Sequence, residues 1–242
     1  MLEKPVHDDA LDADFARRRD AARKRLDALD PAKQPGGADQ DPKRRDWFDA
    51  VYTLAEGDAA NVPWGNLAPH ALLLDFLARQ PRLDGLRALD IGCGLGDNAA
   101  ALADAGATTT AFDFVPLAVD WARSRFGDKS IQFVAADLFA PPDDWRGAFD
   151  FVHETYTLQA LPAELLPAAR QAVAGFVKPG GRLLVICRAR ADDQQIDGPP
   201  WPLARNDVEA FASCGLELER LEEAASGATG NRHWRALFRK PV

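Results

Sequence analysis

The stretch Asp90-Ile91-Gly92-Cys93-Gly94-Leu95-Gly96 decides the fold, because it lies between a short apolar run over 86–91 and a helix-forming run over 98–105. A glycine-rich turn between a strand and a helix is where a doubly wound sheet binds its cofactor. Glycine lets the backbone turn tightly and approach a ligand without a Cβ in the way. The stretch therefore predicts a cofactor-binding turn after the first strand of an α/β sheet.

The turn differs from the dinucleotide fingerprint G-x-G-x-x-G, whose third glycine would fall at position 97. Asp97 stands there instead, and a carboxylate at the start of the helix would repel a pyrophosphate. Asp113 ends the next strand, 21 residues after Gly92 (113 minus 92), where a ribose-binding carboxylate is expected. The pattern favours a cofactor that contains a ribose and no phosphate.

Strands and helices alternate from residue 68 onward, with about 30 residues per unit, which is typical of a parallel doubly wound sheet. We predict helices over 70–79, 98–105, 116–126, 163–177 and 206–213, and strands over 86–91, 108–112, 131–135, 148–153, 182–187, 216–221 and 233–239. The link 226–230 between the last two strands leaves room only for a hairpin. The expected fold class is therefore α/β, with a seven-stranded, mostly parallel sheet and one antiparallel strand in a C-terminal hairpin.

The chain has 242 residues, enough for one domain with an appendage, and its 47% hydrophobic and 27% charged residues are typical of a globular protein. Residues 1–46 are predicted to form a charged helical arm and linker, followed by the main domain over 47–242. The arm holds eleven basic and eleven acidic residues, so the formal charge of −8 belongs to the main domain. Its apolar face consists of Phe15, Ala22, Leu26 and Leu29. The arm either folds over the main domain or a partner, as a lid, or is a solvated helix.

The net charge and the cysteines exclude several classes of protein. A charge of −8 argues against broad electrostatic binding to nucleic acid or to an anionic membrane. Cys93, Cys187 and Cys214 are too far apart for a disulfide framework or a zinc cluster, so no metal is expected. The sequence contains no signal-peptide pattern and no apolar run of membrane-spanning length. We expect a cytoplasmic protein that is a monomer or a homodimer.

Five motifs follow one another at characteristic spacing: 90–96, Asp113, Ala136-Asp137-Leu138, 149–154, and Lys178-Pro179-Gly180-Gly181. With these motifs the chain resembles the class I S-adenosylmethionine-dependent methyltransferases over residues 47–242. The resemblance implies a Rossmann-like fold with a helical lid, S-adenosylmethionine as the cofactor, and S-adenosylhomocysteine as its product.

The resemblance also implies which residues contact the cofactor. Asp113 would bind the ribose hydroxyls, Asp137 would accept the adenine amino group, and the N–H of Leu138 would lie at the adenine ring. The glycine turn would pass under the methionine half, and His153 would lie near the reacting methyl group. The full implied set is Trp47, Tyr52, Trp64, Asp90, Gly92, Cys93, Gly94, Gly96, Asp113, Phe114, Asp137, Leu138 and His153.

A second, shorter motif precedes the first core helix. Trp47 and Tyr52, followed by Pro63-Trp64, are similar to the lid of thiopurine, thiol and halide methyltransferases. Aromatic faces attract a cation such as the sulfonium by ~0.5–2 kcal/mol, although Trp47 and Trp64 could instead pack helices together. This second resemblance implies a small-molecule acceptor, first a thiol sulfur and next a hydroxyl or carboxyl oxygen.

Methyl transfer requires the nucleophile, the methyl group and the sulfur to lie in line, and a hydroxyl nucleophile usually needs a base where a thiol does not. His153 and Glu154 follow the strand whose end faces the cofactor and are the first candidates for that base, although Glu154 could instead cap the loop. His70 and His233 come after them. The candidate residues of the acceptor pocket are Tyr156, Arg188 and Trp201, of which Arg188 could alternatively pair with a surface acid.

Other activities stay open as alternatives. One is methylation of a protein or a nucleic acid, and another is a cofactor-binding interaction module without turnover. An enzyme that methylates amino groups of nucleic acid would be expected to carry an Asn/Asp-Pro-Pro-aromatic turn after the fourth strand. The chain carries His153-Glu154-Thr155-Tyr156 there. An arginine-directed protein enzyme would require two glutamates in this loop, and only Glu154 is present.

Overall fold

The structure, a computed structural model, describes residues 6–34, 37, 41–196, 198–226 and 230–242, with side chains from residue 13 onward. The chain divides into two compact units, Met1–Leu67 and Ala68–Val242. This boundary lies later in the chain than the one predicted after residue 46. Within the first unit, Trp47, Val51 and Trp64 pack with Leu26 of the N-terminal helix.

The first unit contains α1 (Val6–Leu29), α2 (Arg45–Ala55) and two 3-10 turns, η1 (Pro31–Lys33) and η2 (Ala59–Asn61). Ala22 and Leu26 are buried, as the predicted apolar face requires, and Leu26 packs with Trp47 and Val51 of α2. Leu29 was predicted on the same face but is 60% exposed. The helix ends at Leu29, and Asp30 directs the chain into η1.

Basic side chains of α1 bind the segment 58–66 of the same unit. Arg18 Nη1 lies 2.6 Å from Asp58 Oδ2, Arg23 Nη2 donates to the carbonyl of Pro63 at 2.8 Å, and Arg19 donates to Asn66. These contacts account for the position of the boundary after Leu67. Part of the predicted linker, residues 35–36 and 38–40, lies outside the described residues.

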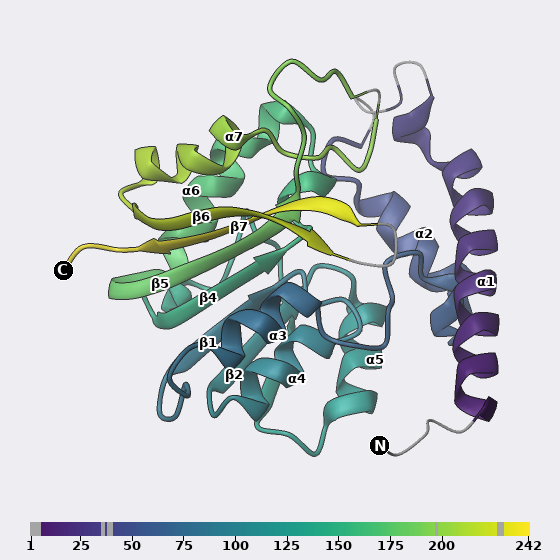
Figure 1. Cartoon of the computed structure of the whole chain (residues 1–242), viewed down its shortest axis with the longest axis horizontal. Helices are drawn as coiled ribbons and strands as arrows, with labels where there is room; N and C mark the ends of the chain where they lie inside the picture. Colours follow the sequence, from purple (N-terminus) through teal and green to yellow (C-terminus); the bar gives the residue numbers. More distant parts are fainter. Residues whose placement is uncertain (1–5, 35–36, 38–40, 197, 227–229) are drawn as a thin grey trace. The chain divides into compact units, whose positions relative to one another are not determined.

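The second unit is built on a seven-stranded sheet with the order β3-β2-β1-β4-β5-β7-β6 (Figure 1). The strands are β1 (Arg87–Ile91), β2 (Thr108–Asp113), β3 (Ile131–Ala135), β4 (Phe149–Thr155), β5 (Val177–Arg188), β6 (Glu217–Ser226) and β7 (Asn231–Arg239). The pairs among β1 to β5 are parallel, and β7 is antiparallel to both β5 and β6. The predicted fold class is confirmed.

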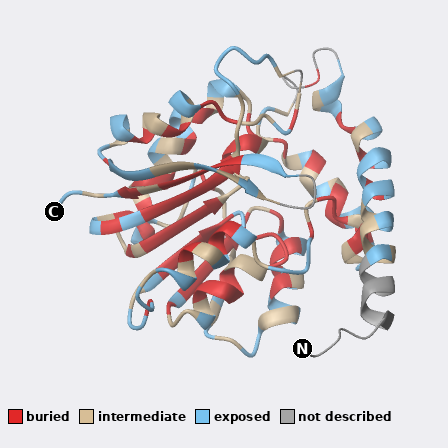
Figure 2. Cartoon of the chain, viewed as in Figure 1, coloured by how far each residue is buried: buried red, intermediate tan, exposed pale blue. Residues whose placement is uncertain are grey.

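Helices cover both faces of this sheet (Figure 1). One face carries α3 (Ala71–Ala78), α4 (Asp97–Asp104) and α5 (Pro116–Phe126), and the other carries α6 (Leu166–Phe176) and α7 (Arg205–Glu209). Alternate residues of β5 enter opposite cores: Leu184 and Ile186 pack with α3 and α4, and Leu183 and Val185 pack with α6. The sequence of a strand that is buried on both faces is a continuous apolar run. Figure 2 shows that these central strands are buried.

Two predicted helices are interrupted. The helix predicted over 163–177 is divided into the 3-10 turn η5 (Ala163–Leu165) and α6, because Pro167 lacks an N–H and fits only the first turn of a helix. The helix predicted over 206–213 consists of α7 and the 3-10 turn η6 (Ala210–Cys214). Strand β5 begins earlier than predicted, at Val177. Two further 3-10 turns are η3 (Asp143–Trp145) and η4 (Leu158–Ala160).

The topology brings distant segments to one edge of the sheet. Because β1, β2, β4 and β5 are parallel, their carboxyl ends meet at the same edge. The antiparallel strand β7 brings its amino end there, and Arg188 at the end of β5 pairs with His233. Residues far apart in the sequence therefore gather beside the glycine turn.

Candidate functional site

The glycine turn requires glycine for two separate reasons. Gly92, Gly94 and Gly96 have φ values of +62°, +51° and +88°, in the left-handed region that disfavours other residues. A Cβ on Gly92 would lie 2.4 Å from Oγ1 of Thr157, and one on Gly96 would lie 3.0 Å from Cβ of Ala122. The turn is therefore pressed between the loop that follows β4 and the helix α5.

Asp113 ends β2 beside this turn. Its Oδ2 accepts the N–H of Gly94 at 3.0 Å, and its Oδ1 accepts the N–H of Val115 at 3.0 Å. Burial raises the pKa of Asp113 to about 6, against the opposing effect of these backbone hydrogen bonds. A carboxylate oxygen accepts more than one hydrogen bond, so both oxygens retain capacity for the two ribose hydroxyls expected here.

Asp90 and His153 form a buried pair between the adjacent strands β1 and β4. The distance from His153 Nδ1 to Asp90 Oδ1 is 2.7 Å, and His153 Nε2 lies 2.8 Å from Oγ1 of Thr155. His153 was predicted to act as a base near the reacting methyl group. The ring is fully buried and both nitrogens are hydrogen-bonded within the chain, which does not favour the catalytic role. These contacts favour a role for His153 in positioning Asp90, and both roles stay predictions.

The second oxygen of Asp90 tests whether S-adenosylmethionine fits this site. Oδ2 of Asp90 is buried and has no hydrogen-bond partner among the described residues. A buried carboxylate oxygen without a partner costs free energy, which a ligand with an N–H donor can recover. The amino group of S-adenosylmethionine is such a donor, and its ribose matches Asp113. The residues present therefore fit the cofactor.

Glu154 was the other first candidate for a base. Its Oε1 accepts the N–H of Leu158 at 2.9 Å, so the side chain caps the turn after β4. Its Oε2 is buried and has no partner among the described residues, and burial raises the pKa of Glu154 to about 7. These contacts and the full burial of the side chain favour the capping role that the sequence left open, and the catalytic role stays a prediction.

The other cofactor residues implied in the second unit lie around the same turn. Oδ1 of Asp137 accepts the N–H of Phe139 at 3.0 Å, just after β3, and Leu138 beside it is buried. Cys93 is buried within the turn, and burial raises the pKa of its thiol well above its ordinary value. Phe114 follows Asp113 directly and is partly exposed. Their contacts with the cofactor stay predictions.

The three aromatic residues implied by the lid motif belong to the first unit. Trp64 Nε1 donates to the hydroxyl of Tyr52 at 3.0 Å, and the two rings meet edge to face with centroids 5.9 Å apart. Trp47 packs with Leu26 and Val51, which is the helix-packing role that the sequence left open. A role for these residues in cofactor binding stays a prediction.

Two histidines and a tyrosine from three distant segments form a hydrogen-bonded row at the carboxyl edge of the sheet. Nε2 of His70 lies 3.0 Å from the hydroxyl of Tyr156, which in turn lies 2.7 Å from Nε2 of His233. The sequence ranked both histidines below His153 and Glu154. They lie 86 and 77 positions from Tyr156, and the only signal that could have joined them was the strand order.

Arg188 and Trp201 adjoin this row. Burial raises the pKa of Tyr156, and the nearby positive charge of Arg188 opposes this rise. Nε of Arg188 is buried without a partner among the described residues. The side chain of Gln159 accepts the N–H of Arg188 at 2.7 Å, and the carbonyl of Gln159 accepts the N–H of Trp201 at 2.7 Å. The structure thus brings the three predicted acceptor residues to one place.

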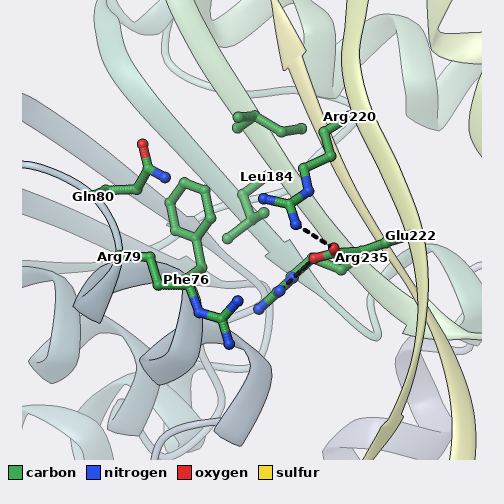
Figure 3. A pocket seen from close by; sticks show the side chains of 8 residues that line it. Phe76, Arg79, Gln80, Leu184, Arg220, Glu222 and Arg235 are labelled. Carbon is green, nitrogen blue, oxygen red and sulfur yellow. Dashed lines mark hydrogen bonds and ion pairs between the residues drawn. The ribbon is translucent and has the colours of Figure 1, made fainter.

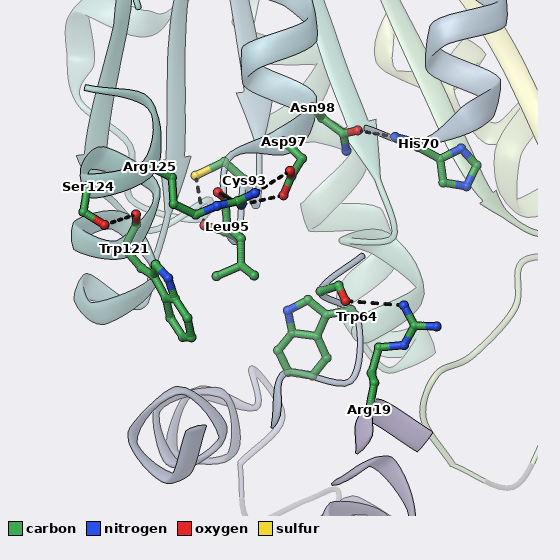
Figure 4. A network of polar contacts seen from close by, with 12 residues as sticks. Arg19, Trp64, His70, Cys93, Leu95, Asp97, Asn98, Trp121, Ser124 and Arg125 are labelled. Carbon is green, nitrogen blue, oxygen red and sulfur yellow. Dashed lines mark hydrogen bonds and ion pairs between the residues drawn. The ribbon is translucent and has the colours of Figure 1, made fainter. Parts of the chain in front are cut away.

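The row lies against the glycine turn. The N–H of His70 donates to Oδ1 of Asn98 at 2.8 Å, in the first turn of α4 (Figure 4). Thr157, next to Tyr156, donates to the carbonyl of Ile91 at 3.2 Å. Two hydrogen bonds therefore connect the row to the start and the end of the turn.

Arg125 of α5 holds the other side of the turn (Figure 4). Its guanidinium makes two bonds to Asp97, of 2.7 and 2.8 Å, and one of 2.6 Å to the carbonyl of Leu95. The carboxylate that argued against a dinucleotide is thus paired with an arginine. This bidentate geometry fixes the start of α4 relative to α5.

A separate hollow lies among α3, β5, β6 and β7 (Figure 3). Its volume is about 30 Å³, far below the ~300–1,000 Å³ of typical small-molecule sites. Arg235 at its wall binds Asp75 at 2.6 Å and the carbonyl of Leu72 at 3.0 Å. These bonds join the start of α3 to β7, and they help to hold His70 opposite His233.

No group of three His, Cys, Asp or Glu side chains among the described residues is placed to hold a metal ion. Within the same ranges, no helix combines the length and the apolarity that crossing a bilayer requires.

Comparison with known proteins shows what the second unit is similar to. Residues 88–181 match the family described as "Methyltransferase domain". The ubiquinone biosynthesis O-methyltransferase of Xanthomonas campestris is 35% identical over 144 residues, which cover 57% of this chain and 54% of that protein. The 2-heptyl-1-hydroxyquinolin-4(1H)-one methyltransferase of Mycobacteroides abscessus is 25% identical and covers 77% of this chain and 83% of that protein. The chain spans only about half the length of the first of these relatives.

Among solved structures, the N-methyltransferase NodS from Bradyrhizobium japonicum, in complex with S-adenosylhomocysteine, superposes with a TM-score of 0.63. The identity is 20%, and the match covers 79% of this chain and 99% of NodS. This likeness confirms the fold. The domain match over residues 88–181 supports a methyltransferase domain as the core of the chain. The thiopurine, thiol and halide subgroup stays a prediction.

Proposed function

We propose that the chain transfers a methyl group from S-adenosylmethionine to an oxygen or sulfur atom of a small-molecule acceptor. The observation that carries this proposal is the glycine turn between two buried carboxylates. Asp90 offers an oxygen without a partner among the described residues, and Asp113 offers two oxygens that the backbone orients. An amino group and a pair of ribose hydroxyls match these acceptors.

Each side chain at the turn has a distinct binding task. Asp113 would bind the ribose, Asp90 the amino group, and Asp137 the amino group of adenine. His153 holds Asp90 in place through the 2.7 Å contact of Nδ1 with Oδ1. When bound, S-adenosylmethionine supplies a methyl group on a positively charged sulfur, and the acidic side chains near it suit that charge.

The acceptor side of the site is formed by Tyr156, Arg188 and Trp201. These residues lie at the carboxyl edge of the sheet, where the row of His70, Tyr156 and His233 contacts the glycine turn. Such a surface can bind the acceptor and orient its nucleophilic atom toward the cofactor, which accelerates transfer by proximity.

The atom that receives the methyl group is the finer part of the proposal. The lid motif Trp47, Tyr52 and Trp64 favours a thiol sulfur. The names of the two relatives favour oxygen, since one is an O-methyltransferase and the other acts on a hydroxyquinolinone. Both kinds of acceptor belong in the first assay.

Calorimetric titration tests the cofactor. S-adenosylmethionine and S-adenosylhomocysteine should bind, and NAD should not, because Asp97 replaces the third glycine of the dinucleotide fingerprint. A signal with NAD alone would contradict the proposal. Release of S-adenosylhomocysteine is then measured with panels of thiols, phenols, aliphatic alcohols and carboxylates. A peptide panel serves as the control for macromolecular acceptors.

The assay also separates the alternatives. Release with small molecules and not with peptides supports the proposal. Cofactor binding without release on any panel would favour an interaction module instead. Reaction with thiols alone would support the thiopurine and thiol resemblance, and reaction with hydroxyl compounds alone would place the chain with oxygen methyltransferases.

A further inference from the structure

The protons in the row of His70, Tyr156 and His233 can be placed from the surrounding hydrogen bonds. Nδ1 of His70 accepts the N–H of Leu72 at 3.2 Å at the start of α3, so in the neutral ring the proton is on Nε2. Nδ1 of His233 lies 2.8 Å from the carbonyl of Asn231, which can only accept a hydrogen bond, so Nδ1 carries the proton of the neutral ring. His70 therefore donates to the Tyr156 oxygen, and Tyr156 donates to Nε2 of His233.

Both imidazoles are held in the neutral form that this arrangement requires. Burial, together with the nearby His233 and His153, lowers the pKa of His70 to about 4. Burial also lowers the pKa of His233, and the charge of Arg188 acts in the same direction. Nε2 of His233 is thus an unprotonated base at neutral pH, and it already receives the proton of the Tyr156 hydroxyl.

Two features distinguish this row from a simple structural link. Tyr156 has a φ of +71°, a left-handed conformation that is strained for a tyrosine and is found mostly where geometry serves a site. Arg188 contributes a positive charge at the same hydroxyl and keeps a buried Nε without a partner among the described residues. A tyrosine that donates to a base and lies near a cation is suited to passing a proton to the base while the cation binds the oxyanion that forms.

We propose that Tyr156 and His233 together accept the proton of the methyl acceptor, that Arg188 binds the resulting oxyanion, and that the acceptor is therefore a hydroxyl compound. This inference rests on the proposed function and specifies its substrate class. His70 is a positioning residue, since its N–H directs the Tyr156 oxygen.

The proton balance is simple. The acceptor hydroxyl gives its proton to the Tyr156 oxygen while the Tyr156 proton moves to Nε2 of His233. The electron pair left on the acceptor oxygen forms the bond to the methyl carbon, and the pair of the broken carbon–sulfur bond stays on sulfur. The result is a methyl ether and a protonated His233, which then releases its proton to water.

Charged and titratable groups approach Tyr156 and His70 from three elements of the fold. His70 approaches from α3, and Arg188 and Cys187 approach from β5. His153 of β4 acts on His70 through its charge. Because the pKa of His233 is below its usual value, the rate with a hydroxyl acceptor should rise with pH through that lowered pKa and then level off.

A binding experiment tests the inference without turnover. The protein saturated with S-adenosylhomocysteine is titrated with 4-nitrophenol, whose visible absorption reports the fraction of phenolate. In the wild-type protein the apparent pKa of bound 4-nitrophenol should fall by about one unit, because the cation stabilises the phenolate and the base takes up its proton.

Arg188→Gln and Tyr156→Phe should abolish this fall in the apparent pKa, and Arg188→Lys should restore part of it. Arg190→Gln is the matched control, because Arg190 bonds to Pro202 and Asp207 outside the row.

Kinetics on the reacting acceptors of the panel provide the second measurement. Tyr156→Phe keeps the ring contacts with His70 and His233 and removes only the hydroxyl. Its kcat with a hydroxyl acceptor should fall by ~100-fold or more, with a change below about threefold in KM and with a lost pH dependence. His233→Gln should behave alike. Any thiol acceptor should lose less than about fivefold, because a thiol ionises without this base.

The outcomes separate this inference from the proposed function. If S-adenosylhomocysteine binds and the phenolate shift is the same in wild type, Tyr156→Phe and Arg188→Gln, the inference is wrong and the proposed function stands. If Tyr156→Phe lowers the melting temperature and slows hydroxyl and thiol acceptors equally, the row is structural and the inference is again overturned. If S-adenosylhomocysteine does not bind the wild-type protein, the proposed function fails and the inference fails with it.

Discussion

His153 Nδ1 lies 2.7 Å from Asp90 Oδ1, across two paired strands, and no part of the imidazole is exposed. This contact connects β4 to the residue that opens the glycine turn. The contact fixes Oδ1 of Asp90 and leaves Oδ2 available to a ligand. We therefore expect the histidine to affect cofactor binding through the carboxylate, although its ring is enclosed within the protein.

Replacement of His153 by leucine should weaken both folding and cofactor binding. The change leaves Oδ1 of Asp90 buried without a donor, which costs about 2–3 kcal/mol of unfolding free energy. Urea unfolding measures the stability, and calorimetry measures the affinity for S-adenosylhomocysteine. His153→Asn is the matched control, because its amide can still donate to Asp90. Equal stability and affinity for the leucine variant and the wild type would show that the contact has no role.

Cofactor affinity should depend on pH through Asp113. Burial raises its pKa to about 6, and a protonated carboxyl group loses acceptor capacity toward the ribose hydroxyls. The affinity should be constant above pH ~7 and should fall by about tenfold per pH unit well below pH 6. Calorimetry between pH 5 and pH 8 measures this fall in affinity, because that pH range brackets the Asp113 pKa of about 6.

The variant Asp113→Asn provides the control for this pH dependence. Its affinity should be lower by about 1.5–3 kcal/mol at neutral pH, and the fall below pH 6 should disappear. Without cofactor, the stability changes in the opposite sense. Because the folded pKa lies above the ordinary 3.8, the contribution of Asp113 to the unfolding free energy rises as the pH falls from 6 toward 4. An affinity that does not change with pH would remove Asp113 from the ribose site.

The sheet was predictable because each strand has its own local signal. The apolar runs that became β1, β2 and β4 are short and bounded by glycine or acidic residues, and the short hairpin link forced β7 to be antiparallel. The position of Asp113 at the end of β2, beside the turn, was also predictable, since its distance from Gly92 along the chain follows from one strand–helix–strand unit. The interruption at Pro167 was missed because the apolar spacing continues through it.

The acceptor side of the site was less predictable, for two physical reasons. Successive residues of a strand point to opposite faces, so His153 and Glu154 could not both face the cofactor. His153 contacts Asp90 on the face of α3 and α4, and Glu154 caps the turn at Leu158. The row around Tyr156 depends on the register that pairs Arg188 with His233, which no local pattern contains.

Replacement of Glu154 by glutamine should stabilise the protein at high pH. Burial raises the pKa of Glu154 from its ordinary 4.5 to about 7, so its ionised form destabilises the fold above pH 7. The neutral amide keeps an acceptor oxygen for the N–H of Leu158. The gain in unfolding free energy should develop as the pH rises from 4.5 to 7, reach about 2–3 kcal/mol at pH 9, and vanish below pH ~4.

The same variant tests whether Glu154 is a catalytic base. Because the capping oxygen remains, Glu154→Gln should keep a rate within about twofold of the wild type at pH 7. Urea unfolding at several pH values and the release of S-adenosylhomocysteine are measured on the same preparations. A loss of activity with unchanged stability would return Glu154 to the catalytic site.

Replacement of Arg125 by methionine should loosen the glycine turn. Arg125 makes two bonds to Asp97 and one to the carbonyl of Leu95, and both side chains of the ion pair are mostly buried. Loss of the bidentate pair leaves a carboxylate at the start of α4 and frees the turn that carries Gly92 to Gly96. We expect the affinity for S-adenosylhomocysteine to fall by about five- to tenfold, equivalent to about 1–1.4 kcal/mol, and kcat to fall less.

Arg125→Lys should give an intermediate loss, because a lysine keeps the charge and cannot bind in bidentate fashion. Arg205→Ala removes an exposed pair with Glu209 and should leave the affinity unchanged. If Arg125→Met binds the cofactor as tightly as Arg205→Ala does, the turn is held by its glycines and Asp113 alone.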